Sequence, residues 1–133
     1  RWSQPIPGFA DPHESRMNQD FLRLRLASLE HEVCGLMLLD NQFRLIAYLE
    51  PFRGTLAQAA VYPREIVKIA LHYNAAAAIL AHNHPSGLAE ASTADIALTR
   101  QLREALALVD VRLVDHCIVA GVDVVSMSQT GDL

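Results

Sequence analysis

The chain has 133 residues, of which 51% are hydrophobic and 20% charged, and its formal net charge is −4 with a pI near 5.8. This length and balance favour one globular domain with its own core over a disordered chain or two domains. The negative charge disfavours direct nonspecific nucleic-acid binding, and no apolar stretch approaches the roughly 20 residues of a membrane span.

The chain is expected to open with an irregular lead-in over residues 1–16, followed by a single domain over residues 17–133. Because the first residue is Arg1 rather than Met, we expect the sequence to be either a shortened chain or the C-terminal part of a longer polypeptide. Cys34 and Cys117 lie in apolar runs, where a reduced, packed cysteine is the ordinary state. With no secretory signal pattern in view, a cytoplasmic setting is expected.

The first third of the domain predicts one helix followed by a strand pair. Over residues 17–29, apolar side chains recur at helical spacing. The almost unbroken apolar run Val33–Leu39 is typical of a strand covered on both faces. Asp40-Asn41 supplies a turn, and Phe43–Glu50 then alternates apolar and polar residues as a partner strand with one buried face.

A second helix and a buried strand follow. Pro63 is placed as the first helical position, and Asn74 marks the end of the helix. The run Ala75–Ala81 contains residues that favour helices, but it is short, follows a helix end and runs into a turn. We therefore expect a buried central strand there.

The last third predicts a long helix and another strand pair. Ser92–Val109 carries a stripe of apolar residues, as an amphipathic helix does. Arg112–Ala120 and Val122–Met127 predict two strands joined across Gly121. Helices and strands alternate in the middle of the chain, with hairpins at both ends. The sequence therefore predicts an α/β fold with a mixed central β-sheet flanked by helices.

Two histidines stand at the exit of the expected central strand, in the stretch ILAHNHPSG. On an extended chain, residues i and i+2 point to the same side, so His82 and His84 present their imidazoles together while Asn83 faces away. Pro85 keeps His84 extended, and Gly87 allows a sharp turn. Two neutral imidazoles are thereby aimed at one point.

A catalytic zinc ion takes three protein ligands and keeps one position open for water. Asp95 is the candidate third ligand, because the short loop 87–91 can fold the start of the long helix back over His82 and His84. The stretch Ser92-x-x-Asp95 is also a capping-box pattern, and taken alone it favours capping. Together with the His-x-His and Pro-Ser-Gly stretches, however, it predicts a zinc site.

Two other interpretations of the stretch at residues 82–84 are rejected. The letters HNH invite a nuclease interpretation, but nuclease motifs of that name draw their residues from separated positions. A zinc deaminase needs a His-x-Glu followed by a Pro-Cys-x-x-Cys, and the two scattered cysteines exclude that pattern.

Taken together, these stretches resemble a known family. HNHPS followed by S-x-x-D is similar to the JAMM signature of the JAB1/MPN metalloproteases. Within that superfamily, the stretches AHNHPSG, VYPREIVKIAL, YNAAAAILA and LVDHCIVAG resemble the bacterial RadC-like JAB domain, from about Met17 to the C-terminus. The resemblance implies a cytidine-deaminase-like (JAB1/MPN) fold and Zn²⁺ held by His82, His84 and Asp95.

The resemblance also implies two catalytic residues. The family places a glutamate just ahead of a strand of the form Glu-x-Cys/Phe-Gly-x-Leu, and EVCGLMLL puts Glu32 there, with Glu30 as a nearby competitor. Glu32 would act as the general base toward a zinc-activated water, whose pKa falls toward about 7. Ser92 would stabilise the intermediate by donating to the developing oxyanion. On sequence alone, Glu32 reads as an exposed residue at a strand start.

This chain departs from many RadC-like sequences at two positions, where Ala91 replaces a proline and Leu88 replaces a small or acidic residue. Neither change removes a ligand. Asp115 and His116 recur in the family's final strand, where support of the ligands or strand packing is a better interpretation than a fourth ligand, since a closed site would block water. The remaining histidines are expected at the surface: His13, His31 and His72.

Two hypotheses of function follow. The first is a zinc-dependent peptidase or isopeptidase acting on a protein or peptide substrate that the sequence does not identify. The second is a metal-stabilised binding module associated with DNA repair, without peptidase activity, although the acidic pI disfavours unspecific DNA contact. Exposed strand edges could support a homodimer. A domain that has lost its metal is disfavoured, because every ligand position is intact.

Overall fold

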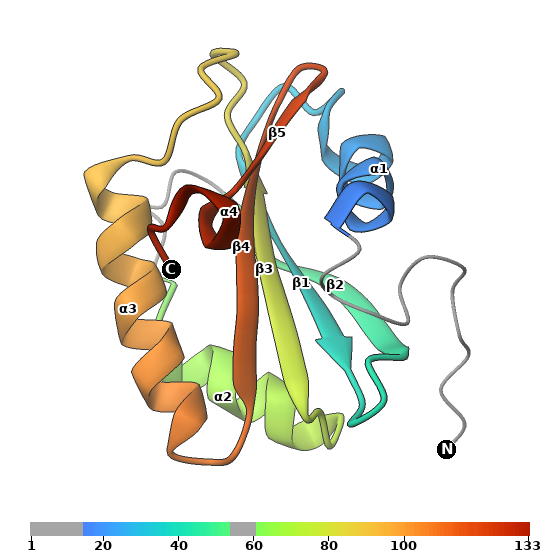
Figure 1. The fold of residues 1–133 in the computed structure, drawn as a ribbon, viewed down its shortest axis with the longest axis vertical. Helices are drawn as coiled ribbons and strands as arrows, with labels where there is room; N and C mark the ends of the chain where they lie inside the picture. The colour runs from blue at the N-terminus through green and yellow to red at the C-terminus, as the bar shows by residue number, and fades with distance from the viewer. Residues whose placement is uncertain (1–14, 54–60) are drawn as a thin grey trace.

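The computed structural model of the chain describes residues 15–53 and 61–133. These residues form one five-stranded sheet with helices on both faces (Figure 1). The elements in chain order are α1 (Ser15–Leu26), β1 (Val33–Leu39), β2 (Leu45–Arg53), α2 (Pro63–His72), β3 (Ala77–Asn83), α3 (Thr93–Ala107), β4 (Arg112–Ala120), β5 (Asp123–Ser126) and α4 (Met127–Thr130).

The sheet is mixed, with strand order β2-β1-β3-β4-β5. Only β3 and β4 run parallel, and α3 makes the crossover between them. The other three neighbouring pairs are antiparallel. The α/β fold with a mixed sheet flanked by helices, as predicted from the alternation of elements, is confirmed.

Each face of the sheet packs against its own helices because successive strand residues point to opposite faces. One face packs against α1 through the fully buried Leu22 and Leu26. The opposite face packs against α2 and α3, with Ile66 and Leu102 among the buried residues. In Figure 1, α1 and the α2–α3 pair accordingly lie on opposite sides of the strands. Strand β1 is buried along its whole length, as its unbroken apolar run predicted.

Several element boundaries differ from the prediction. The helix α1 begins two residues before Met17 and ends at Leu26, three residues before Leu29. The strand β2 begins at Leu45 rather than Phe43, because Phe43 has a left-handed φ of 60° in the turn that closes the hairpin. The end of α2 near Asn74 agrees with the prediction, since Asn74 takes a φ of 54° directly after the helix.

The most consequential shift concerns β3, which spans Ala77–Asn83 rather than Ala75–Ala81. The amide of Ala75 donates to the carbonyl oxygen of Ala70, so residue 75 still closes the preceding helix. At the other end, the strand continues through two buried polar residues, His82 and Asn83. The first histidine is therefore part of the strand itself.

The C-terminus contains a short helix that the sequence reading missed. Met127 was predicted to end a strand, but it begins α4, and the side chain of Ser126 accepts a hydrogen bond from the amide of Gln129 to cap that helix. The expectations about His13, residues 1–14 and the connection around Gly54 lie outside the described residues. None of the described helices is long and apolar enough to cross a membrane.

Candidate metal centre

His82 and His84 leave the sheet at the end of β3 on the same side, as the two-residue period of a strand requires. The amide of His84 still donates to the carbonyl oxygen of Val119 on β4, at 2.8 Å, which holds the chain extended one residue beyond the strand. A turn follows, in which the amide of Gly87 donates to the carbonyl oxygen of His84 at 3.0 Å and Gly87 adopts a φ of 85°. That positive φ favours glycine there.

Asp95 reaches the histidines from the first turn of α3. The residue before this helix, Ser92, accepts a hydrogen bond from the amide of Asp95 at 3.0 Å, and the Asp95 carboxylate accepts one from the amide of Ser92 at 2.7 Å. The capping box is therefore present. It is compatible with a ligand role, because the same carboxylate also faces both imidazoles.

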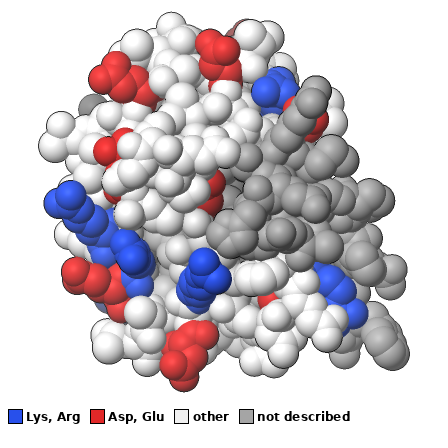
Figure 2. Space-filling view, in the orientation of Figure 1, with Lys and Arg blue, Asp and Glu red and all other residues white. Residues whose placement is uncertain are grey.

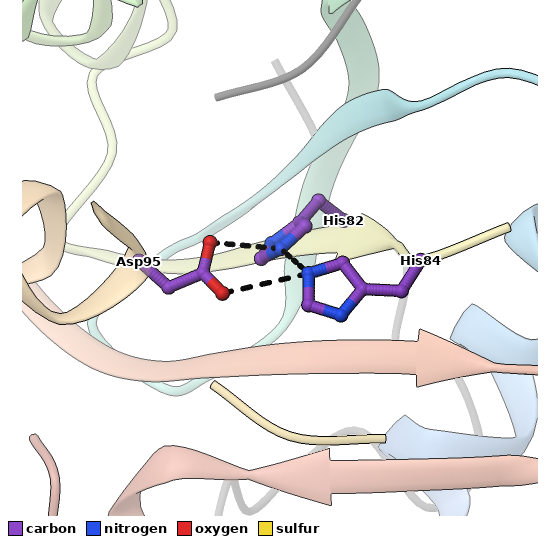
Figure 3. A group of neighbouring side chains, drawn as sticks. All are labelled: His82, His84 and Asp95. Carbon is purple, nitrogen blue, oxygen red and sulfur yellow. Dashed lines mark hydrogen bonds and ion pairs between the residues drawn. The ribbon is translucent and has the colours of Figure 1, made fainter. Parts of the chain in front are cut away.

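The three side chains converge on one point (Figure 3). The Nε2 atoms of His82 and His84 lie 2.8 Å apart. His82 Nε2 lies 3.0 Å from Asp95 Oδ1, and His84 Nε2 lies 3.5 Å from Asp95 Oδ2. The side chains of His82 and Asp95 are each 2% exposed, whereas that of His84 is 13% exposed, so solvent reaches the cluster at His84.

A chain of buried hydrogen bonds fixes which nitrogen of His82 carries a proton. The Thr99 hydroxyl donates to the carbonyl oxygen of Asp95 at 2.6 Å, and its oxygen lies 2.5 Å from Nδ1 of His116. A hydroxyl has a single proton, so when Thr99 gives it to this carbonyl oxygen, His116 Nδ1–H is the donor to Thr99. Complete burial lowers the pKa of His116 to about 3 and keeps this ring neutral, which leaves a lone pair on its Nε2.

The same reasoning shows which ring nitrogens of His82 and His84 have a free lone pair. His116 Nε2 lies 2.8 Å from Nδ1 of His82, so His82 donates from Nδ1 and, when neutral, has a lone pair on Nε2. His84 Nδ1 lies 2.9 Å from the carbonyl oxygen of Leu88, which can only accept, so His84 has its own lone pair on Nε2 as well. Both lone pairs are directed toward the carboxylate of Asp95.

Such a cluster of acceptors needs a cation, either a proton or a metal ion, to hold it together. Burial alone would raise the pKa of the Asp95 carboxyl, but a positive charge and a hydrogen-bond donor on the His82 side, together with hydrogen bonds from Ser92, hold that pKa well below its usual range. The carboxylate therefore stays ionised at neutral pH. Two imidazoles and one carboxylate are ligands that zinc accepts, and three protein ligands leave a further position for water. The donor set thus fits a catalytic metal site.

Glu32 comes to the same end of the sheet. The antiparallel register pairs Cys34 with His82, so Glu32, two residues before that pair, lies at the end of β1 where His84 leaves β3. Its Oε2 is buried and has no hydrogen-bond partner among the described residues. Glu30, by contrast, is exposed. The geometry favours Glu32 over Glu30 as the base, which stays a prediction.

Ser92, the other predicted catalytic residue, has a hydroxyl proton available. The described hydrogen bonds use its Oγ as an acceptor from Asp95, so its O–H can still donate to a bound group.

The two cysteine thiols, of Cys34 and Cys117, are both buried. Burial raises the pKa of Cys34 to about 12 and that of Cys117 well above its ordinary value. Neither thiol is prepared to replace a ligand.

The sequence reading missed two supporting residues. Thr99 lies one helical turn after Asp95 on the same side of α3, and this spacing of four residues is the signal that could have found it. Asn83 was expected to face away from the ligands, and it does, but its side chain contacts the segment that carries Glu32. Of the other histidines, His31 and His72 are exposed, as expected.

Asp115 lies outside the group of candidate ligands and makes hydrogen bonds within the protein. It is buried, and its carboxylate accepts hydrogen bonds from the amides of His116 and Ser128 and from the hydroxyl of Ser126. These contacts tie β4 to β5 and to the start of α4.

Comparison with known proteins identifies the family of this chain. The sequence model of the RadC-like JAB domain matches residues 13–132. A UPF0758 protein of Methylibium petroleiphilum is 63% identical over 113 residues, covering 85% of this chain and 51% of the relative. UPF0758 proteins of Leptothrix cholodnii and Cellvibrio japonicus are 56% and 55% identical and cover 94% and 92% of this chain, and 55% and 53% of their own lengths. The chain therefore spans about half the length of the curated relatives it matches, and it belongs to the RadC-like JAB domain family.

Proposed function

We propose that this domain is a zinc-dependent hydrolase of amide bonds, a peptidase or an isopeptidase. The observation that carries the proposal is the convergence of three acceptor groups, from His82, His84 and Asp95, within 2.8 to 3.5 Å of one another. A structural zinc site is closed by four protein ligands, whereas a catalytic one has three. Among the described residues, the cluster that could hold a metal has three members, which supports a catalytic site.

When bound, Zn²⁺ supplies a Lewis acid that polarises a carbonyl group and lowers the pKa of a water molecule to about 7. The residues of the chain would position the ligands and leave a path for water and substrate. His82 and Asp95 are held rigidly by their buried hydrogen bonds, so the ligands are positioned before substrate arrives. The partly exposed His84 marks the side from which water and substrate can approach.

Glu32 and Ser92 would handle the proton and the developing charge. Glu32 has a buried carboxylate oxygen with no partner among the described residues, and as an ionised carboxylate it could take a proton from the attacking water. Ser92 retains a hydroxyl proton that could be donated to the carbonyl oxygen as negative charge develops there. The start of α3, with its positive dipole end, would favour the same charge.

The decisive experiment measures metal and turnover together. We expect the purified chain to bind zinc, to cleave one or more members of a panel of peptides and isopeptide-linked substrates, to lose cleavage on chelation and to regain it with added zinc. Glu32→Gln should keep the zinc and lower turnover by about 10²- to 10⁴-fold, because it removes the base but no ligand. Glu30→Gln is the matched control and should leave turnover unchanged, since Glu30 is exposed.

Several outcomes would contradict the proposal. A chain that folds fully without metal and takes up none would remove the metal site, and full turnover in Glu32→Gln would remove Glu32 from the mechanism. Salt-dependent DNA binding that survives the loss of His82 or His84, without cleavage of any substrate, would instead favour the DNA-associated binding module. Figure 2 shows one group of adjoining Lys and Arg side chains at the left of the face it draws, with Asp and Glu side chains beside it and elsewhere on that face.

A further inference from the structure

Asn83, the residue between the two histidines, contacts the chain on the other face of the sheet. It is 2% exposed, and its side chain makes three hydrogen bonds. Its Oδ1 accepts from the amide of Val33 at 2.7 Å. Its Nδ2 donates to the carbonyl oxygens of His31 at 2.9 Å and of Leu29 at 3.4 Å. Donors and acceptors match at all three contacts, which fixes the orientation of the amide.

These contacts bracket Glu32 on both sides. Residues 27–32 connect α1 to β1 and contain no helix or strand. Among the described hydrogen bonds, the carbonyl oxygens of Leu29 and His31 have no partner other than Asn83. Buried or half-buried backbone groups without a partner are costly, so Asn83 takes the place that a ladder hydrogen bond would have in a strand.

The sheet alone does not hold Glu32 in place. The pairing of β1 with β3 ends at Cys34 and His82, two residues short of Glu32, and the pairing of β1 with β2 ends at Val33 and Arg53, one residue short. The buried Oε2 of Glu32 has no hydrogen-bond partner within residues 15–53 and 61–133. Asn83 itself is firmly placed, because it pairs with Val119 on β4 and lies in β3.

We propose that Asn83 is a positioning residue that holds the backbone around Glu32 at a fixed distance from the metal ligands. The proposal rests on the proposed function, in which Glu32 is the base. The tripeptide 82–84 then positions both the metal ligands and the segment that carries the base. His82 and His84 point to one face of the sheet and hold the metal, while Asn83 points to the other face and places the segment that supplies the base.

The test uses Asn83→Ala and Asn83→Asp in the whole chain. The alanine variant removes all three hydrogen bonds. The aspartate variant keeps an acceptor for Val33 but places a carboxylate oxygen against two carbonyl oxygens, so it loses the contacts to Leu29 and His31. The matched control is Asp40→Ala, because Asp40 holds backbone amides of the turn at the opposite end of β1.

We expect both Asn83 variants to retain zinc, measured by competition with a chromophoric chelator, and to lower kcat by about 10- to 100-fold with little change in KM. Asp40→Ala should leave kcat unchanged even if it lowers stability. Amide hydrogen exchange gives a readout that does not depend on activity. The amide of Val33 should be protected in the unchanged chain and should exchange about tenfold faster in Asn83→Ala.

The outcomes separate this inference from the proposed function. If Glu32→Gln abolishes turnover while zinc-loaded Asn83→Ala retains it, the positioning role is wrong and the hydrolase proposal stands. If the unchanged chain cleaves nothing, the exchange measurement still decides whether Asn83 holds the segment. A Val33 amide that exchanges in the unchanged chain as fast as that of the exposed Glu30 would overturn the inference, even if neither Asn83 variant folds.

Discussion

Replacing Thr99 by valine isolates the proton order behind the metal ligands, because valine keeps the shape of threonine and removes only the hydroxyl. In the proton order deduced above, this hydroxyl receives the Nδ1 proton of His116 and donates its own to the carbonyl oxygen of Asp95. Without it, His116 Nδ1–H is buried with no acceptor. The ring can escape this only by moving its proton to Nε2, which would force His82 to carry its proton on the nitrogen that faces the metal.

The expected magnitude follows from the cost of an unsatisfied buried donor, about 1 to 3 kcal/mol. At about 1.4 kcal/mol for each factor of ten, Thr99→Val should weaken zinc binding by about 5- to 140-fold. The assay is competition against a chelator of known affinity, on proteins checked for folding by circular dichroism. Thr99→Ser keeps the hydroxyl and is the control, and it should bind zinc nearly as tightly as the unchanged chain. Equal affinities in Thr99→Val and the unchanged chain would refute the proton order deduced for His82.

Two further predictions concern stability. A Cβ at Gly35 would lie 2.5 Å from the Tyr48 hydroxyl oxygen, so Gly35→Ala should lower the free energy of unfolding by about 1 to 3 kcal/mol in urea titrations. Adding Tyr48→Phe to that variant should restore part of the lost stability. An unchanged unfolding midpoint in Gly35→Ala would contradict this packing. Burial lowers the pKa of His116 from its ordinary 6.5 to about 3, so between these values the unfolded chain binds the proton more readily than the folded one. The stability that a neutral His116 contributes to the metal-free chain should be fully present above about pH 6.5 and be lost as the pH falls toward 3, by up to about 1.4 kcal/mol per pH unit. The free energy of unfolding should therefore depend less steeply on pH in His116→Gln. Identical slopes in the two proteins would contradict a neutral, buried His116.

Much of the fold could be predicted from the sequence because its signals are local. The apolar run of β1 gave that strand its bounds, and the stripe of α3 together with Ser92 gave the helix and its cap. The sequence reading ended β3 two residues too early because it took polar residues as the end of a buried strand. His82 and Asn83 continue the strand because their polar atoms find partners inside the protein.

Part of the candidate site could likewise be predicted from the sequence, and part could not. The convergence of His82, His84 and Asp95 could be predicted because the turn and the helix start lie close to the histidines in the chain. The support of His82 by His116 could not be derived in this way, since that contact spans 34 residues and depends on the register of β3 with β4. The short helix α4 escaped prediction because four residues carry no periodic signal.

The double use of Asp95 has a consequence for anyone who wishes to change the metal preference of this domain. Its carboxylate completes the capping box of α3 and also faces both imidazoles. An engineer who replaced Asp95 by histidine to build a three-imidazole centre would remove half of the helix cap with the same substitution, at a cost of about 1 kcal/mol. Metal chemistry and helix initiation share one side chain here, so a redesigned centre would need a new way to start α3.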